Sequence, residues 1–148
     1  MTRYAAGTEV PVERSRVEIE RTLARYGAAT FVYGTTVDKA MVQFELHRRR
    51  VRFILPLPNR TERRFTHRRV NQYDYAGSRR TAADAERAWE QACRQSWRAL
   101  LLAIKAKLET VEAGIETFEE AFLAQIVLPD DTTVGQWVTL PALEASKP

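Results

Sequence analysis

Apolar residues in this chain of 148 residues follow a helical period first and a strand period next. Over residues 15–26 they recur at intervals of three and four, which predicts a helix. Ser15 followed by Glu18 has the form of a capping box, and Gly27 supplies the left-handed residue that often closes a helix. We therefore expect the first helix to begin at Ser15 and to end before Gly27.

The next segments alternate apolar and polar residues, which is the period of a β-strand. TFVYGTTV predicts a strand that turns near Asp38, because it is rich in β-branched and aromatic residues. AMVQFEL and RVRFILPL predict two more strands. Together they predict a three-stranded antiparallel meander.

The last two strands can pair in a register that keeps apolar residues on one face. A short turn at residues 48–49 pairs Leu46 with Val51 and Phe44 with Phe53. Arginines are poor residues for the positive φ of a two-residue hairpin, and a longer loop there keeps the same pairing. The other face then carries polar side chains: Gln43, Glu45, His47, Arg50 and Arg52.

About 22 residues without clear periodicity follow Pro58, and such long loops usually either bind something or are disordered. From near Thr81 the helical period returns and predicts one helix of about 32 residues. Thr117 and Glu120 form a second capping box that opens a short helix. Residues 126–138 fit either a small hairpin or a strand followed by a turn of helix, and the tail 141–148 is expected to fray.

These elements predict an α+β fold in which the N-terminal helix and the long helix pack on the meander. At this length we expect a single domain spanning residues 1–148. No run of about 18 apolar residues is long enough for a membrane span, and the N-terminus lacks a secretory pattern, so we expect a cytoplasmic protein without a membrane partner. Cys93, the one cysteine, lies in an apolar helical pattern, which favours a packed thiol over a reactive one.

Positive charge is concentrated in the middle of the chain. Residues 47–80 carry eleven arginines against two acidic residues, whereas the balance is six to six in residues 1–46 and six to eleven in residues 81–148. Cations at this density repel one another unless a polyanion or an acidic surface meets them. The segment uses arginine throughout and no lysine, and the guanidinium fork engages phosphate oxygens in pairs.

Aromatic residues lie among these arginines, a mixture that often holds single-stranded nucleic acid. The binding residues that this interpretation assigns are Arg48, Arg49, Arg50, Arg52, Arg60, Arg63, Arg64, Arg68, Arg69, Tyr73, Tyr75, Arg79 and Arg80. The aromatic residues Tyr33 and Phe65 fit a stacking role or the core equally well. Trp89 and Trp97 fit the core or a subunit interface better than a stacking role.

Several cations also have an ordinary structural explanation. Glu45 opposite Arg52 forms an expected cross-strand ion pair of about 0.2–1 kcal/mol. A stripe of cations on the long helix either extends the basic surface or is simply solvated: Arg87, Arg94, Arg98 and Lys105.

No catalytic or cofactor motif is present, so we expect a protein that is not an enzyme and that has no cofactor or metal. His47 and His67 lie among arginines, which favours solvated or phosphate-contacting imidazoles over metal ligands. A magnesium-dependent nuclease is the remote alternative, and it would use carboxylates from two acidic pairs: Glu119, Glu120, Asp130 and Asp131.

Three stretches carry a resemblance over residues 15–137: LARYGA, a strand pair ending in FILPLP, and WRALLLAIKAKLETVEAGIETFEEAFLAQIVLPD. They resemble a group of small bacteriophage and mobile-element proteins that carries no activity to transfer. The resemblance implies a setting in which proteins handle DNA or contact host factors. The helix, meander, helix order also resembles double-stranded-RNA-binding domains, but residues 81–84 replace the lysine-rich start of their last helix.

These observations predict a sequence-independent nucleic-acid-binding protein, with single-stranded DNA favoured, in phage or mobile-element recombination or replication. The alternative is a protein-interaction module, either a host-factor inhibitor or a self-assembling structural protein. In that case the basic segment meets an acidic surface on a host protein or on another copy in a homo-oligomer.

Overall fold

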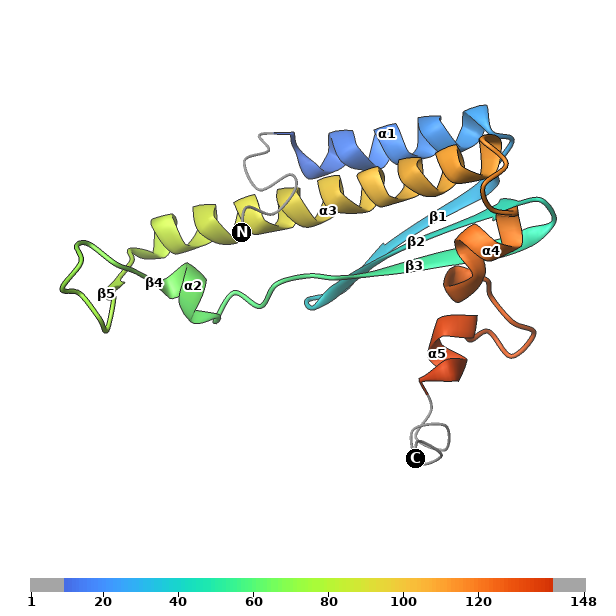
Figure 1. The fold of residues 1–148 in the computed structure, drawn as a ribbon. Coiled ribbons are helices and arrows are strands. Elements are labelled where there is room, and N and C mark those ends of the chain that lie inside the picture. Colours follow the sequence, from blue (N-terminus) through green and yellow to red (C-terminus); the bar gives the residue numbers. More distant parts are fainter. Residues whose placement is uncertain (1–9, 140–148) are drawn as a thin grey trace.

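The computed structural model describes residues 10–139 and has an α+β fold (Figure 1). An N-terminal helix, a three-stranded antiparallel sheet and one long helix follow one another, as predicted. In chain order the elements are α1 (Val12–Arg25), β1 (Ala29–Thr35), β2 (Lys39–Leu46), β3 (Arg49–Pro56), α2 (Arg63–Thr66), β4 (His67–Arg68), β5 (Ser78–Arg79), α3 (Ala82–Glu112), α4 (Phe118–Phe122), the 3₁₀ turn η1 (Leu123–Gln125) and α5 (Val134–Val138). The predicted frayed tail, residues 141–148, lies outside the described residues.

Helix α1 begins one turn earlier than predicted. Its N-cap is Pro11, and Ser15 is fully buried inside the helix instead of capping it. The physical reason is that Val12, Ser15 and Ile19 fall on one helical face, so the additional turn lets Val12 pack against the core. The other end was predicted correctly, because Gly27 follows the helix with a φ of +94°.

The hairpin of β2 and β3 differs from the predicted register by two residues. Phe44 lies opposite Val51, and the turn consists of His47 and Arg48, which both have positive φ (50° and 62°). A shift of two leaves every side chain on its predicted face, because strand faces alternate with a period of two. It does change the partners: Glu45 lies opposite Arg50, so the predicted pair of Glu45 with Arg52 is wrong.

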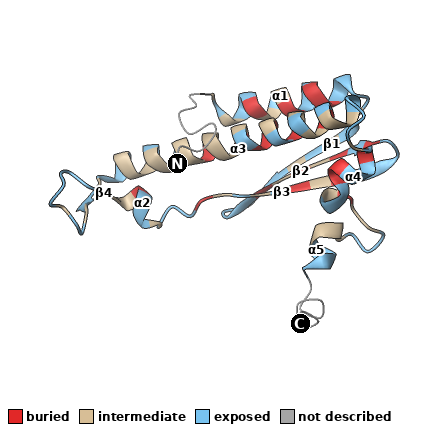
Figure 2. Ribbon diagram, in the orientation of Figure 1, coloured by how far each residue is buried: buried red, intermediate tan, exposed pale blue. Residues whose placement is uncertain are grey.

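The core lies between one face of the sheet and the two long helices (Figures 1 and 2). Helices α1 and α3 lie side by side above the sheet, and Leu101 and Ile104 of α3 are fully buried. Phe44 and Phe53 point to the same face and meet Phe122 of α4 in edge-on ring contacts. α3 has 31 residues, close to the prediction, and spans roughly 46 Å.

The N-terminal part of α3 extends past the sheet and carries the segment for which the sequence showed no periodicity (Figure 1). Residues 59–80, which we call the arm, form the short helix α2 and a two-stranded ribbon of β4 and β5. The ribbon has two residue pairs, His67 with Arg79 and Arg68 with Ser78. Two pairs are too few to leave a recognisable alternation in the sequence.

The chain after α4 closes the outer edge of β3. Ile126 bridges to Val51, and the amide of Val127 donates to the carbonyl of Arg50 at 2.9 Å. Val127 then bridges to Thr133, which caps α5, so this ambiguous region turns back on itself and ends in a short helix. The capping box predicted at Thr117 is present at the start of α4.

Candidate nucleic-acid interface

The arginine-rich segment is divided between two ends of the molecule (Figure 1). The hairpin tip, residues 47–50, lies beside α4, whereas the arm lies beneath the first turns of α3 and extends beyond its N-terminus. The eight residues of β3 separate them by roughly 26 Å at the usual strand rise. The predicted single basic surface of hairpin and arm is therefore two separate surfaces, because strand β3 runs straight between them.

At the hairpin tip two of three arginines have carboxylate partners. Arg49 Nε lies 3.3 Å from a carboxylate oxygen of Glu119, and Arg50 Nη1 lies 3.7 Å from Asp131. Arg48 makes no ion pair with residues 10–139. The carboxylates come from the segment that follows α3, so the fold itself neutralises most of this tip.

Arg52 is a structural residue. Its Nε donates to Gln43 at 2.9 Å, and its Nη1 and Nη2 donate to the carbonyl and the carboxylate of Asp131, both at 2.7 Å. Its side chain is only 12% exposed. A guanidinium held in this way ties the turn before α5 to the sheet, and it has few donors left for a phosphate.

At the base of the arm a tryptophan holds the chain against α3. The indole Nε1 of Trp89 donates to the carbonyl of Pro58 at 2.7 Å, and the guanidinium of Arg60 lies 3.7 Å from the ring centroid. Arg60 also pairs with Glu86, one turn earlier on α3. Trp89 is half-buried and anchors the arm, so it lies at the margin of the core, and the predicted role in a subunit interface stays a prediction.

The next turn of the arm is fixed by a buried ring and a local ion pair. Phe65 is buried, which resolves its role in favour of the core. Arg64 pairs with Glu62 at 2.6 Å and lies over the Phe65 ring at 4.5 Å. The amide of Arg80 donates to the carbonyl of Thr66 at 2.7 Å and closes the ribbon.

Beyond this base the arm presents cations that form no ion pair within residues 10–139, although Arg68 and Arg69 lie near enough to Asp84 and Asp74 to contribute to the lowered pKa of each carboxylate. The side chains of Arg63, Arg68 and Arg79 are exposed and make no hydrogen bond or ion pair of their own with residues 10–139. Arg69 donates to two backbone carbonyls of its own loop, at 3.2 and 3.4 Å, and its guanidinium lies 5.4 Å from the centroid of the Tyr75 ring. These four guanidinium groups keep their charge and most of their donors available.

The loop between β4 and β5 is shaped by Asp74. This carboxylate accepts hydrogen bonds from the Val70 amide at 3.2 Å and from the Ser78 hydroxyl at 2.8 Å. The hydroxyl of Ser78 first, and the amide next, hold the pKa of Asp74 below its ordinary value. Within this loop Tyr73 and Tyr75 are 74% and 82% exposed, so two aromatic faces lie next to free cations.

The other predicted aromatic and cationic residues serve the core. The Tyr33 hydroxyl donates to the Arg16 carbonyl at 3.2 Å, and burial raises the pKa of Tyr33 to about 12. On α3, Arg98 and Lys105 both pair with Glu18 of α1, at 2.7 and 2.9 Å. Two cations of the stripe therefore join α3 to α1, whereas Arg87 pairs with Asp84 and Arg94 donates to Gln91 within α3 itself.

The acidic pairs considered for a nuclease are engaged separately. Glu119 pairs with Arg49, Glu120 completes the capping box of α4, Asp130 accepts from Thr132, and Asp131 accepts from Arg52. Among residues 10–139 no three side chains of the types that bind metals are grouped around one point. Cys93 is buried, and burial raises the pKa of its thiol, as expected for a packed residue.

The sequence pointed to the arginines but gave no sign of which ones are neutralised. Glu119 and Asp131 are 70 and 79 residues away from the arginines they bind. Trp89 and Asp74, which hold the arm in shape, also escaped the prediction, although a carboxylate three residues before Gly77 is a recognisable turn signal.

Comparison with known proteins returned no matching family model, no matching curated protein and no matching solved structure. Within residues 10–139 no helix combines the length and the apolar character needed to cross a membrane.

Proposed function

We propose that the arm binds nucleic acid without sequence preference and that single-stranded DNA is its preferred form. The observation that carries the proposal is the set of free guanidinium groups on Arg63, Arg68, Arg69 and Arg79. The arm holds seven arginines against two acidic residues, so its guanidinium groups repel one another until a polyanion neutralises them. Phosphate oxygens match the guanidinium fork, and no base needs to be read for this contact.

The exposed tyrosines support the preference for single strands. Tyr73 and Tyr75 offer aromatic faces at the end of the arm, where an unpaired base can stack for about 1–3 kcal/mol. Bases in a duplex are already stacked and paired, so they gain less from the same rings. Tyr73→Ala with Tyr75→Ala should therefore weaken binding to an oligo(dT) strand more than binding to a duplex of the same length.

The main experiment is a salt titration by fluorescence anisotropy with a labelled oligo(dT) strand. Replacing Arg63, Arg68 and Arg79 together by glutamine should lower the affinity at least tenfold. It should also reduce the slope of log affinity against log salt by about two, since each phosphate contact on a single strand contributes about 0.7. The matched control replaces Arg14, Arg21 and Arg25 by glutamine, which removes the same charge from exposed sites on α1.

A salt-independent affinity in the wild-type protein would contradict the proposal. So would equal losses in the arm variant and in the control, because net charge alone would then explain the binding. Circular dichroism of each variant checks that the fold is retained.

A second candidate is contact between copies of the chain. The free cations of the arm lie at the opposite end of α3 from Glu109 and Glu112, so the arm of one molecule can reach an acidic end only on another. Such a head-to-tail contact does not close on itself and builds open chains. Mass measurement after nuclease treatment tests this candidate, since assemblies that persist without nucleic acid and dissolve in high salt would support it.

A further inference from the structure

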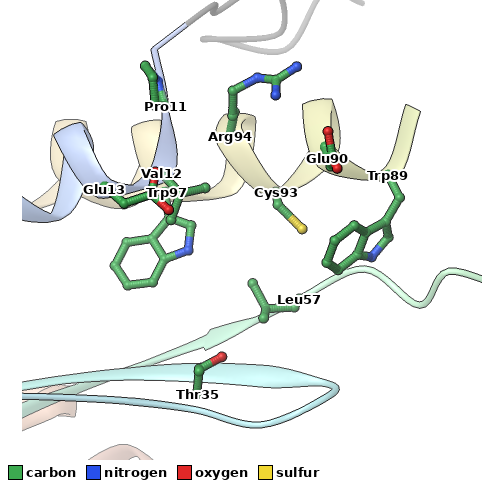
Figure 3. A pocket seen from close by; sticks show the side chains of 10 residues that line it. All are labelled: Pro11, Val12, Glu13, Thr35, Leu57, Trp89, Glu90, Cys93, Arg94 and Trp97. Carbon is green, nitrogen blue, oxygen red and sulfur yellow. The ribbon is translucent and has the colours of Figure 1, made fainter. Parts of the chain in front are cut away.

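A cavity of about 570 Å³ lies beside the base of the arm, between α3, the start of α1 and the ends of β1 and β3 (Figure 3). Its wall on α3 consists of Trp89, Cys93 and Trp97. Leu57, which follows β3, and Val12 of α1 complete the apolar lining. The volume falls within the range of roughly 300–1,000 Å³ that is usual for sites that hold one small molecule.

The three α3 residues share one helical face because they are spaced by four. Figure 3 shows their side chains directed toward Leu57 across the hollow. Trp97 and Cys93 are almost completely shielded from solvent, whereas Trp89 is partly exposed at the side nearest the arm. Two indole rings and a thiol therefore form one continuous apolar wall.

The charges around the cavity decide which ligands it can hold. Glu13 and Glu90 line its mouth together with one cation, Arg94. The guanidinium of Arg94 donates to the side chain of Gln91 at 3.0 and 2.6 Å, and Figure 3 shows it directed away from the hollow. Two more cations lie against the tryptophans of the wall, with Arg60 3.7 Å from the centroid of Trp89 and Arg16 5.9 Å from that of Trp97. Carboxylates and cations therefore surround the cavity together and favour neither sign of charge, and a charged ligand would lose water against an apolar wall.

The thiol in the wall adds no charge. Burial is the first cause that raises the pKa of Cys93, so the thiol stays protonated at neutral pH. Thr35 provides one hydroxyl at the far side of the hollow. The wall of α3 and Leu57 is thus apolar and uncharged, Thr35 provides one hydroxyl opposite the helix, and the charged residues of the lining are Glu13, Glu90 and Arg94.

We propose that this cavity is a binding site for a small uncharged aromatic molecule. Trp89 and Trp97 lie two turns apart, roughly 12 Å along the helix axis, so a flat ring placed over Cys93 can contact either indole in an offset or edge-on geometry. Trp89 is also the residue that holds Pro58 and Arg60, so the ligand would contact the side chain that anchors the arm. This site is separate from the proposed nucleic-acid interface, and its test contains no nucleic acid.

The experiment titrates the full-length chain with N-phenyl-1-naphthylamine, an uncharged aromatic probe that fluoresces in apolar surroundings. We expect saturable binding of one probe per chain, together with quenching of tryptophan fluorescence. Cys93→Phe and, separately, Leu57→Phe fill the cavity from opposite walls and should each weaken binding at least tenfold. Ile115→Phe enlarges an exposed residue elsewhere by the same volume as Leu57→Phe and should leave binding unchanged.

Thermal unfolding of each variant shows whether it is folded. Two filling variants are used so that one remains for the test if the other does not fold. Absence of saturable binding to the wild-type chain would overturn the proposal. So would wild-type affinity for the probe in both filling variants, provided that both are folded. Equally tight binding of 8-anilinonaphthalene-1-sulfonate would contradict the uncharged class. A wild-type dimer that the probe dissociates would show that the cavity is a subunit interface instead.

Discussion

The hairpin tip and the arm are both rich in arginine, but they differ in how these arginines are paired with carboxylates. At the tip, Arg49 and Arg50 meet Glu119 and Asp131, which arrive from the C-terminal part of the chain. On the arm, no element crosses over the ribbon, and its outer arginines keep their charge. Arginine density therefore identifies a basic segment, but the fold decides which part of it can meet a partner.

The difference has a structural cause. The segment after α4 closes the edge of β3 at Ile126, which brings its carboxylates to the tip. The arm instead extends past the last strand pair, where only the first turns of α3 lie beside it. Glu86 and Glu62 neutralise its base, and the outer half is left to solvent.

Limited proteolysis with trypsin should give the largest contrast between the two regions. Cleavage after Arg68 or Arg69 should be at least about ten times faster than cleavage after the arginines of the tip. The ribbon of the arm has two residue pairs, whereas the hairpin of β2 and β3 has eight, so the arm opens at a lower free energy. Mass spectrometry of the first fragments measures the ratio.

Saturating oligo(dT) provides the control for that experiment. It should slow cleavage in the arm and leave the tip unaffected if the arm is the interface. Faster cleavage at the tip than in the arm would contradict the comparison itself.

Replacing single arginines should separate structural cations from free ones. Arg52→Ala removes three hydrogen bonds from a mostly shielded guanidinium and should lower the free energy of unfolding by about 2–3 kcal/mol. Arg79→Ala should change it by no more than about 0.5 kcal/mol, because the side chain has no partner among the described residues. Urea unfolding measures both values.

Arg52→Lys is the matched control, since it keeps the charge but not the fork that reaches Asp131 at two points. An intermediate loss is expected for it. Equal stability of Arg52→Ala and Arg79→Ala would show that the contacts of Arg52 have no net effect on folding.

The turn of the tip can be improved without changing the arm. His47 and Arg48 both have left-handed φ, which asparagine and glycine adopt at much lower cost. Arg48→Gly keeps the contact of the His47 ring with Phe118, whose centroids lie 4.9 Å apart, and should raise the free energy of unfolding by about 1 kcal/mol while leaving oligo(dT) affinity nearly unchanged. Arg50→Gly places glycine in the strand instead and should lower stability.

The smallest expected effect is a change in the β4–β5 loop when Asp74 becomes protonated at low pH. Hydrogen bonds hold the pKa of Asp74 below its ordinary value of 3.8, so its loop keeps its shape above that pH and loosens as the pH falls through the lowered pKa. The Val70 amide shift in an NMR titration should therefore have its midpoint below 3.8. Asp74→Asn should remove this transition but not the separate titration of Glu119 at the tip.

For Glu119 the midpoint should also lie below its ordinary value of 4.5, chiefly because a backbone amide and secondly because Arg49 stabilise the carboxylate. A midpoint of Asp74 at or above 3.8 would show that its hydrogen bonds do not hold the loop.

The fold could be predicted where periodicity alone determines it. The apolar spacing of α3 and the alternating faces of β2 and β3 were predicted correctly, because burial of one face fixes both. The register was not, since it depends on whether His47 and Arg48 accept left-handed backbone angles. Ser15 misled the prediction because a capping motif inside a helix has the same letters as one at its start.

The candidate site was predictable only as a composition. Eleven arginines are visible in the sequence, but the partners of Arg49 and Arg52 lie 70 and 79 residues further along the chain. The ribbon of the arm and the anchoring role of Trp89 depend on contacts that leave no period in the sequence. The sequence thus showed which segment is positively charged, but only the folded structure shows which of its arginines are free to bind a partner.

The placement of the arm at one end of α3 makes the molecule an electric dipole. Free guanidinium groups gather at the N-terminal end of this roughly 46 Å helix, and Glu109 and Glu112 lie near its C-terminal end. In the field of any polyanion such a molecule turns until its long axis points along the field lines, with the arm foremost. If the arm binds nucleic acid as proposed, each molecule would contact the nucleic-acid strand with one end only. Many molecules could then bind next to one another along the strand.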